Sequence, residues 1–486
     1  MPATIKVVDG RTVIRLGENT AEATRQAQLA IDAANTLSGA GFVAVEEEDS
    51  YAILDSTGQR LFRIDANGQS MFDPSDRLVD LIQSRALPDT PGQYGFIPAP
   101  YVLLHFYGQS LSLGLGSEET LSGASPYSNT LMPNTGVHDA AWTGGSEGLT
   151  GTASLATDLV PLNGAINSHD IEAPVIGASN QLASRMQAAS IIAANAGRGG
   201  FGVGGLQKGF NGGDGPYTLL LDQYQTYLGL AGRPVRPFLC WMQGEADANS
   251  AITKAAYTSA VQAIINNYAA DTGQPIHFFT YQLSSHTIRA PSYNPNPALA
   301  LAEMGENSAD VSVVTPMYLF DYVDGVHPTA EGMRLAGEYF GKAIDHHLRT
   351  GTKFRPLTPI AVVRDGKTIT VTFHVPVGSL VYDDSRVSDP GNMGFEVFLQ
   401  SGGGALPIAD AYVFGDKAVI ELVDDPGGPV DLCYAMGTTL NGQPAGRLIG
   451  ARGCLRDQDT TVSQSNRSIA LHNYCVHFRK GEGYGA

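Results

Sequence analysis

The stretch Pro100-Tyr-Val-Leu-Leu-His-Phe-Tyr-Gly-Gln-Ser110 sets the architecture of the middle of this chain. It begins with apolar and β-forming residues, and a segment rich in serine and glycine follows it, which predicts a buried strand that ends at a polar loop. Open α/β sheets bind ligands at the carboxyl ends of their strands, so Ser110 is a candidate reactive group. Gly68-Gln-Ser70 repeats the last three residues, but it follows a turn-forming segment with no strand before it, which argues against Ser70.

Four further apolar segments repeat this pattern at residues 189–194, 237–242, 275–283 and 310–316. Helical stretches separate them. One predicted helix, over residues 257–268, keeps its apolar residues on one face and has Asp247 and Asn249 as candidate caps, and another follows Pro328. Alternation of short buried strands with helices predicts a parallel sheet covered by helices on both faces, a three-layer α/β/α fold.

The two flanks differ from this central part. Residues 20–37 predict a helix with a narrow, alanine-rich apolar face, and β-like runs at 51–54 and 60–64 predict a small meander. A helix with so narrow an apolar face buries little surface alone, so it either packs against another chain or belongs to a flexible arm. Toward the other end, the alternation Thr-Ile-Thr-Val-Thr-Phe-His at 368–374 and frequent turns predict an all-β sandwich or jelly roll. We therefore expect three domains, over residues 1–95, 96–352 and 353–486.

The composition argues against several classes of function. The chain has 486 residues, 43% of them hydrophobic, and a net charge of −18 without a basic stripe, which disfavours nucleic acid or an anionic membrane as partner. No apolar run is long enough to span a bilayer, and residues 1–6 lack the apolar core of a secretion signal, so we expect synthesis in a cytoplasm.

The four cysteines point to neither a metal site nor a disulfide framework. They are Cys240, Cys433, Cys454 and Cys475, and they show no Cys-x-x-Cys spacing. One bridge among the last three stays open.

Asp324-Gly-Val-His327 supplies two further groups that a serine-dependent ester cleavage requires. Such chemistry needs a base that takes the hydroxyl proton and a carboxylate that holds the base. At this spacing the Asp324 carboxylate can fold back onto one imidazole nitrogen of His327 while the other nitrogen faces Ser110. Pro328 favours an extended backbone at His327 and lets the next helix begin at once. The alternative is an ordinary Asp-Gly turn with an exposed histidine.

Candidate donors for an oxyanion lie in two other segments. Gln243 ends an apolar run, so its neutral side-chain amide can point from the sheet edge toward the crevice of Ser110. A backbone donor is expected in the glycine loop over residues 196–202, which follows the strand at 189–194. The same loop could cradle a phosphate, but no Lys-Ser/Thr pair follows it, which argues against nucleotide binding.

Other titratable residues have simpler explanations. His105 lies within the first strand, and His346 and His347 lie near the polar end of a helix, so core or surface roles are expected for all three. Glu245 and Asp247 are too close on one loop to flank the scissile bond of a glycoside, and we expect them to brace the loop or cap a helix.

The segments at 108–110, 241–245 and 324–327 resemble the sequence blocks of the SGNH, or GDSL-like, hydrolase superfamily. The resemblance is closest to the sialate O-acetylesterase-like branch, which includes carbohydrate esterase family six. Gly-Gln-Ser, Trp-Met-Gln-Gly-Glu and Asp-Gly-Val-His match this branch in type and order. Two departures, Leu111 in place of a frequent asparagine and Phe201 in place of a threonine, leave the chemistry intact but weaken any transfer of substrate specificity.

The resemblance implies a flavodoxin-like catalytic domain in which Ser110, Asp324 and His327 form the triad. The oxyanion hole would consist of the Ser110 N–H, the Gly199 N–H and the Gln243 amide. Gly197 is the alternative glycine. The implied reaction is removal of O-acetyl groups from a carbohydrate, with no metal or other cofactor.

The flanks resemble parts of other proteins. Residues 52–55 and 62–68 are similar to modules of tailed-phage or prophage tail proteins, and residues 450–457 and 471–475 look like the β domain that accompanies such esterases, where it could bind carbohydrate. This implies a tail fibre or tailspike that acts on a polysaccharide such as a capsule, with an acetylated carbohydrate as substrate and a homotrimer or other tail proteins as partners. The alternatives are a phage adhesin that only binds glycan, and a lipase or thioesterase for longer acyl chains.

Overall fold

The computed structural model describes residues 101–117, 119–141, 148–166, 170–186, 189–288, 294–440 and 442–485, and only the strands among the first hundred residues. The chain divides into two units, Met1–Ile97 and Pro98–Ala486. Each unit is described by itself.

The first unit contains two antiparallel sheets. The predicted meander at 51–64 is confirmed, because β3, β4, β5 and β6 pair in that order, and the backbone of Ser70 pairs with Ile64. The predicted helix at 20–37 lies outside the described residues. The strands are β1 Thr4–Val8, β2 Arg11–Arg15, β3 Val43–Glu47, β4 Ser50–Leu54, β5 Arg60–Asp65 and β6 Ser70–Met71.

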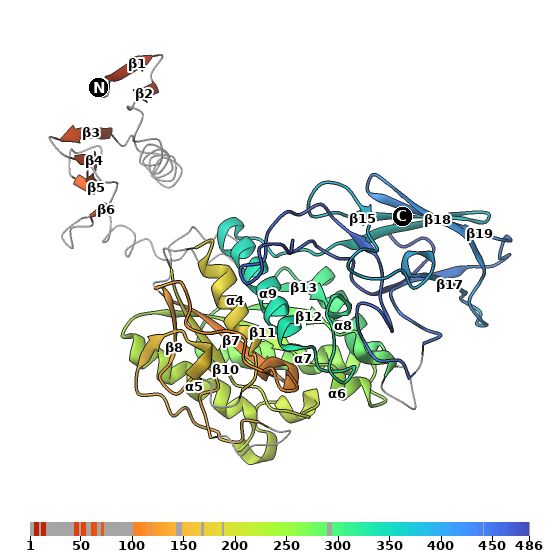
Figure 1. Cartoon of the computed structure of the whole chain (residues 1–486), viewed down its shortest axis with the longest axis horizontal. Coiled ribbons are helices and arrows are strands. Elements are labelled where there is room, and N and C mark those ends of the chain that lie inside the picture. Colours follow the sequence, from red (N-terminus) through yellow and green to blue (C-terminus); the bar gives the residue numbers. More distant parts are fainter. Residues whose placement is uncertain are drawn as a thin grey trace. The chain divides into compact units, whose positions relative to one another are not determined.

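A seven-stranded sheet forms the centre of the second unit (Figure 1). Its order is β13-β12-β11-β7-β10-β8-β9, and every neighbouring pair is parallel except β8 with β9. The five strands predicted from the sequence are all present, and they are joined by the two short strands β8 and β9. The seven are β7 Tyr101–Gly108, β8 Thr130–Pro133, β9 Leu159–Pro161, β10 Ser190–Asn195, β11 Val235–Met242, β12 His277–Gln282 and β13 Val311–Pro316.

Helices cover both faces of this sheet, which is why its central strands are apolar on both sides. On one face α4 packs against α9, and on the other α7 packs against both α5 and α8. The α4–α9 contact is close because it contains glycine: a Cβ atom at Gly337 would lie 1.9 Å from the Pro174 carbonyl oxygen. The longer helices are α4 Pro174–Ala183, α5 Pro216–Ala231, α7 Lys254–Thr272, α8 Asn296–Asn307 and α9 Ala330–Thr350.

Two one-turn helices and several 3₁₀ turns complete this part. They are α3 Ser110–Leu113, α6 Glu245–Ala248, η1 Gly164–Ile166, η2 Val203–Leu206, η3 Phe210–Gly213, η4 Ser285–Thr287, η5 Met317–Leu319 and, further on, η6 Asn392–Gly394.

The predicted caps of α7 were wrong. Thr253 caps this helix, since its hydroxyl accepts from the Ala256 N–H, whereas Asp247 and Asn249 belong to the separate helix α6 and its end. Thr329 caps α9 in the same way, through the Gly332 N–H. A Ser or Thr hydroxyl satisfies an N–H that has no partner within the helix.

The C-terminal part is built from antiparallel sheets, as predicted. One sheet has the order β14-β15-β19-β18, a second β17-β20-β22, and β16 pairs with β21. The fold class of the second unit, a three-layer α/β/α part followed by an all-β part, is therefore confirmed. The strands are β14 Thr358–Asp365, β15 Thr368–His374, β16 Val381–Tyr382, β17 Phe395–Leu399, β18 Ile408–Phe414, β19 Lys417–Leu422, β20 Val430–Tyr434, β21 Leu455–Arg456 and β22 Phe478–Gly481.

Polar contacts tie the all-β part to the α/β part. Gln282 donates to the His477 carbonyl, and the Tyr318 hydroxyl donates to the Cys475 carbonyl. Both parts fall within one unit, so the boundary at 352/353 stays a prediction. Cys433, Cys454 and Cys475 are free thiols, so the bridge left open among them is not formed.

None of the helices among the described residues is both long and apolar enough to cross a membrane.

Candidate active site

Ser110 lies at the carboxyl end of β7, the central strand of the sheet. β7 ends at Gly108, and Ser110 is the first residue of α3, so the turn between them brings the hydroxyl out of the sheet edge. The serine is 7% exposed. Strand–turn–helix is the local structure that presents a nucleophilic serine in α/β hydrolases.

His327 reaches Ser110 from the loop between β13 and α9. The Ser110 Oγ lies 2.8 Å from His327 Nε2, and His327 Nδ1 lies 2.7 Å from Asp324 Oδ2. Because the carboxylate accepts from Nδ1, the imidazole presents Nε2 to the hydroxyl, which is the arrangement that a serine base requires. The three residues named from the sequence are thus brought together in one hydrogen-bonded chain.

Asp324 is held in place by its own loop. Its other oxygen, Oδ1, accepts from the backbone N–H groups of Val326 and His327. Partial burial by itself raises the pKa of Asp324, but hydrogen bonds from the His327 backbone and side chain and from Val326 outweigh it, and the pKa lies below the ordinary value. Asp324 therefore stays ionised opposite the imidazole at neutral pH.

Gly116 supports the other side of the imidazole. This residue has φ +85°, and a Cβ atom here would lie 2.5 Å from the Cβ of His327. Any larger residue would displace the ring from Ser110, so the segment after α3 fixes the position of the imidazole.

Gln109 joins the two central strand ends, a role that the sequence did not reveal. Its side-chain oxygen accepts from the N–H groups of Gly244 and Ala246, at the end of β11. The Gly-Gln-Ser and Gln-Gly-Glu segments are therefore locked to each other. In the sequence, the only indication of this contact is that each of the two segments contains a glutamine next to a glycine.

Gln243 lies fully buried at the end of β11, and protein groups fix its amide. Its oxygen accepts from the Tyr257 hydroxyl at 2.8 Å, while its nitrogen donates to Asp247 Oδ2 at 2.5 Å and to the Phe201 carbonyl at 3.4 Å. The contact with Phe201 is long, so this N–H is the one that a ligand could recruit.

The carboxylates of this loop hold it in place, as expected. Burial raises the pKa of Asp247, although hydrogen bonds from Val203 and Gln243 oppose this. Glu245 is 1% exposed and accepts from the Tyr281 hydroxyl at 2.5 Å. These contacts give neither carboxylate the open setting of a glycosidase acid.

The glycine loop after β10 offers one of its two candidate donors. The Gly197 N–H already donates to Asn195 Oδ1, and the Arg198 N–H donates to the Gly108 carbonyl. Within the described part of the chain, the backbone N–H groups of Gly199 and Ser110 donate no hydrogen bond. This favours Gly199 over Gly197 as a donor to a bound group.

The remaining candidate histidines lie elsewhere. His105 is fully buried between Tyr268 and Gln223, and burial lowers its pKa to about 4 in spite of the Gln223 hydrogen bond. The ring of His347 packs at a tilt against that of His277, at the amino end of β12, with ring centroids 3.9 Å apart. Both have structural roles.

Among the described residues, no group of three or more His, Cys, Asp or Glu side chains is arranged to hold a metal ion. The hydroxyl of Ser110, the imidazole of His327 and the carboxylate of Asp324 are groups that can support nucleophilic and acid–base chemistry.

Residues 165–346 match the model of a family described as "SASA: Carbohydrate esterase, sialic acid-specific acetylesterase". The matched residues include Gln243, Asp324 and His327, whereas Ser110 precedes them. No curated protein sequence matches this chain.

XAC1771 and NanS are two of the similar solved structures. XAC1771, a carbohydrate acetylesterase from Xanthomonas citri, has 15% identity and a TM-score of 0.55, over 90% of this chain and 86% of that chain. NanS has 15% identity and a TM-score of 0.38, over 52% of this chain and 99% of that chain. The likeness to XAC1771 shows a shared fold that extends through both the α/β and the all-β parts.

Proposed function

We propose that this protein is a serine esterase that removes O-acetyl groups from a carbohydrate. The observation that carries the proposal is the chain from Ser110 Oγ through His327 to Asp324, with distances of 2.8 and 2.7 Å, at the carboxyl edge of the sheet. The family match over residues 165–346 supports carbohydrate as the substrate class and acetyl as the acyl group.

In the acylation step, Ser110 Oγ attacks the ester carbonyl while His327 Nε2 takes the hydroxyl proton. His327 then gives this proton to the departing sugar oxygen, and the acetyl group stays on Ser110. Asp324 keeps the imidazole oriented and stabilises its charged form. In the second step a water molecule attacks the acetyl-serine, with His327 again as base, and acetate leaves.

The negative charge on the carbonyl oxygen needs donors in place before the reaction. The N–H groups of Ser110 and Gly199 have no partner among the described residues, and they are the donors in this proposal. The third is the Gln243 N–H that now makes the long contact with Phe201. Tyr257 and Asp247 hold the amide so that this N–H is the one presented.

We extend the proposal to the setting of the enzyme: a phage tail fibre or tailspike, assembled as a homotrimer and directed at an acetylated polysaccharide. The support is the resemblance of residues 52–55 and 62–68 to tail-protein modules. Light scattering of the purified chain should give three times its 51.3 kDa mass. A monomer would contradict the trimer and leave the esterase proposal intact.

The test of the esterase is hydrolysis of 4-nitrophenyl acetate, butyrate and octanoate, and release of acetate from an acetylated polysaccharide. Ser110→Ala should lower kcat by about 10⁴-fold or more, whereas Ser70→Ala, which changes the same tripeptide motif, should leave it unchanged. Unchanged turnover in Ser110→Ala would refute the mechanism. Faster turnover of octanoate than of acetate would favour a lipase, and no serine-dependent turnover would favour an adhesin.

A further inference from the structure

A cavity of about 360 Å³ lies at the far end of α9, between this helix and the C-terminal all-β part. Its walls come from α9, from the link at 352–355 and from residues of the all-β part at 374–377 and 459–473. A helix rise of about 1.5 Å per residue places Lys342 roughly 18 Å along α9 from Ala330. His327 precedes Ala330, so the cavity is separate from the site at Ser110.

The cavity is strongly cationic. Its two carboxylates, Asp345 and Asp459, face five cationic side chains, an excess of three positive charges in a chain whose net charge is −18. The five are Arg185, Lys342, Arg349, Lys353 and Arg355. A local concentration of one charge sign inside a concave site attracts ligands of the opposite sign.

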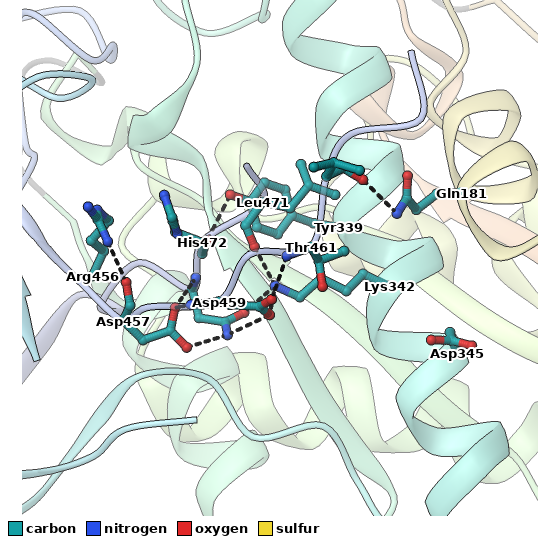
Figure 2. Close-up of polar contacts among 12 residues, drawn as sticks. Gln181, Tyr339, Lys342, Asp345, Arg456, Asp457, Asp459, Thr461, Leu471 and His472 are labelled. Carbon is teal, nitrogen blue, oxygen red and sulfur yellow. Dashed lines mark hydrogen bonds and ion pairs between the residues drawn. The ribbon is translucent and has the colours of Figure 1, made fainter. Parts of the chain in front are cut away.

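Lys342 forms part of the wall. Its ammonium group donates to the Leu471 carbonyl and to Asn473 Oδ1, and it pairs with Asp459 Oδ2 at 2.9 Å. Figure 2 shows this group reaching from α9 to the loops around Asp459 and Leu471. Its three donors are used, so Lys342 shapes the cavity and leaves ligand binding to other residues.

The three arginines in the lining have guanidinium N–H groups that do not bond to Asp345. Arg185 Nε and Arg349 Nη2 both bond to Asp345 Oδ2, which leaves the other guanidinium nitrogens of both residues without a bond to that carboxylate. Arg355 is exposed, and its side chain forms no ion pair with any described residue. Guanidinium groups can bind carboxylates in a bidentate manner, so these three residues are suited to bind an anion.

Asp345 adds an acceptor to this cationic wall. The residue is 1% exposed, and its Oδ1 atom has no hydrogen-bond partner in the described part of the chain. A buried carboxylate oxygen without a donor is costly, and a ligand hydroxyl would supply one. Asp345 lies one turn beyond Lys342 on the same helix (Figure 2).

The positive charge of the cavity adds to the effect of burial on the pKa values of two histidines in its lining. Burial and then the charge of Arg349 lower the pKa of His346, and burial and then the charge of Arg355 lower the pKa of His374. The cavity also has an apolar wall, formed by Phe354, Pro376 and Val377. An apolar wall combined with a few polar groups is typical of a small-molecule site.

We propose that this cavity binds a sugar acid, a pyranose ring that carries a carboxylate and hydroxyl groups, as one residue of an acidic glycan. The carboxylate pairs with Arg355 and with the guanidinium N–H groups of Arg185 and Arg349 that do not bond to Asp345. A ring hydroxyl donates to Asp345 Oδ1, and the C–H face of the ring packs on Phe354. A bare phosphate would use the arginines but leave the apolar wall and the Asp345 acceptor unmatched.

This proposal deepens the proposed function, since it gives an esterase acting on glycans a second point of attachment to an acidic chain. Binding itself does not require catalysis. The two proposals can therefore fail separately, because one is measured as ligand binding and the other as ester turnover.

The test is isothermal titration of the full chain with D-glucuronate at low ionic strength, with D-glucose and inorganic phosphate as comparison probes. We expect saturable glucuronate binding that weakens as salt is raised, with no binding of glucose. Arg355→Gln should weaken it at least tenfold. The matched control is Arg233→Gln, which changes another exposed arginine outside the cavity. Equal melting temperatures of the two variants exclude unfolding as the cause.

The proposal would be overturned by the absence of saturable glucuronate binding, by equal affinity in Arg355→Gln and wild type, or by phosphate bound as tightly as glucuronate. The titration is repeated with Ser110→Ala. Unchanged binding there supports a separate site, whereas loss of binding would place glucuronate at Ser110 and refute the proposal.

Discussion

The candidate active site and the cationic cavity lie at opposite edges of the central sheet, and they are formed by contacts of different range along the chain. At the carboxyl edge, Asp324 and His327 are three residues apart in one loop, and a hydrogen bond joins their side chains. Ser110, just after the end of β7, bonds to the other nitrogen of His327. At the amino edge, the cavity needs α9, the segment after it and two stretches of the all-β part. Helix α9 connects the edges, because it begins just after His327 and carries Arg349 at its other end. Short-range hydrogen bonds therefore suffice to orient the imidazole of His327, whereas the charged cavity depends on packing between distant segments.

The two edges also differ in how burial and neighbouring groups affect the pKa values of their ionisable side chains. Hydrogen bonds from neighbouring groups lower the pKa of Asp324 against the effect of burial, so its charge is supported by local donors. Burial lowers the pKa of Lys342, even though Asp459 and Asp457 oppose this effect. The ionised form of Asp324 is thus favoured at the first edge, whereas burial disfavours the ionised form of Lys342 at the second.

The largest expected effect is at the carboxyl edge. His327→Ala removes the base and should lower kcat for acetyl esters by about 10⁴-fold. Asp324→Asn keeps the imidazole but no longer orients it correctly, and it should lower kcat by about 10²- to 10⁴-fold. Steady-state kinetics at several pH values measures both. A His327→Ala variant that retains a tenth of wild-type kcat would show that the loop does not supply the base.

The next effect tests the wall of the cavity. Lys342→Met leaves the largely buried Asp459 carboxylate without its cationic partner and removes a donor from the Leu471 carbonyl, and it should lower the free energy of unfolding by roughly 3–5 kcal/mol. Lys208 makes a similar pair with Asp271 at 2.6 Å, but its side chain is 49% exposed. Lys208→Met should therefore cost about 1 kcal/mol or less. Equal losses in denaturant titrations of the two variants would show that Lys342 does not hold the wall.

Gln243 tests whether the oxyanion site extends to β11. Gln243→Ala should lower kcat by about 10²- to 10³-fold with little change in KM, as loss of a side-chain oxyanion donor does. Tyr257→Phe removes only the hydroxyl that orients the amide, so its effect should be smaller. If Gln243→Ala keeps wild-type kcat, the amide is a structural group and the backbone donors act without it.

The smallest effect concerns the pH response of the amino edge. Burial, with the neighbouring Arg236 guanidinium, lowers the pKa of His347 to about 4, below its ordinary value of 6.5. Between these pH values the unfolded chain binds a proton that the folded chain does not. Stability is therefore full above pH 6.5 and falls as the pH drops toward 4, by up to about 3 kcal/mol.

His347→Gln removes this titration, so its free energy of unfolding should depend less on pH over that window than the wild type's. Denaturant titrations at pH 7, 5.5 and 4.5 measure the slope. An unchanged slope would mean that His347 binds its proton equally well in the folded and unfolded chains, which would contradict the lowered pKa.

The sequence predicted most of the central fold because the signals are local. Apolar runs such as 237–242 end at glycine or polar residues, and each central strand was found in this way. β8 and β9 were missed because they are only four and three residues long and end in proline. The true cap of α7, Thr253, was missed because several polar residues precede the helix and only packing decides among them.

The same distinction holds for the candidate sites. Ser110, Asp324 and His327 are recognisable because a strand end and a three-residue spacing bring them together. The clamp of Tyr257 and Asp247 on Gln243 and the bridge from Gln109 depend on contacts between neighbouring strand ends. The cavity joins Arg185 to Asp459, and no periodicity or motif in the sequence relates residues so far apart.

The most direct test of the central claim is covalent labelling of the enzyme with a fluorophosphonate, followed by peptide mass spectrometry. The claim is that His327 activates Ser110 as the nucleophile. It predicts one phosphonyl group per chain, on the peptide that contains Ser110, with no label in Ser110→Ala and much slower labelling in His327→Ala. A label on another serine, such as Ser70, or equally fast labelling of Ser110 without His327, would contradict the claim.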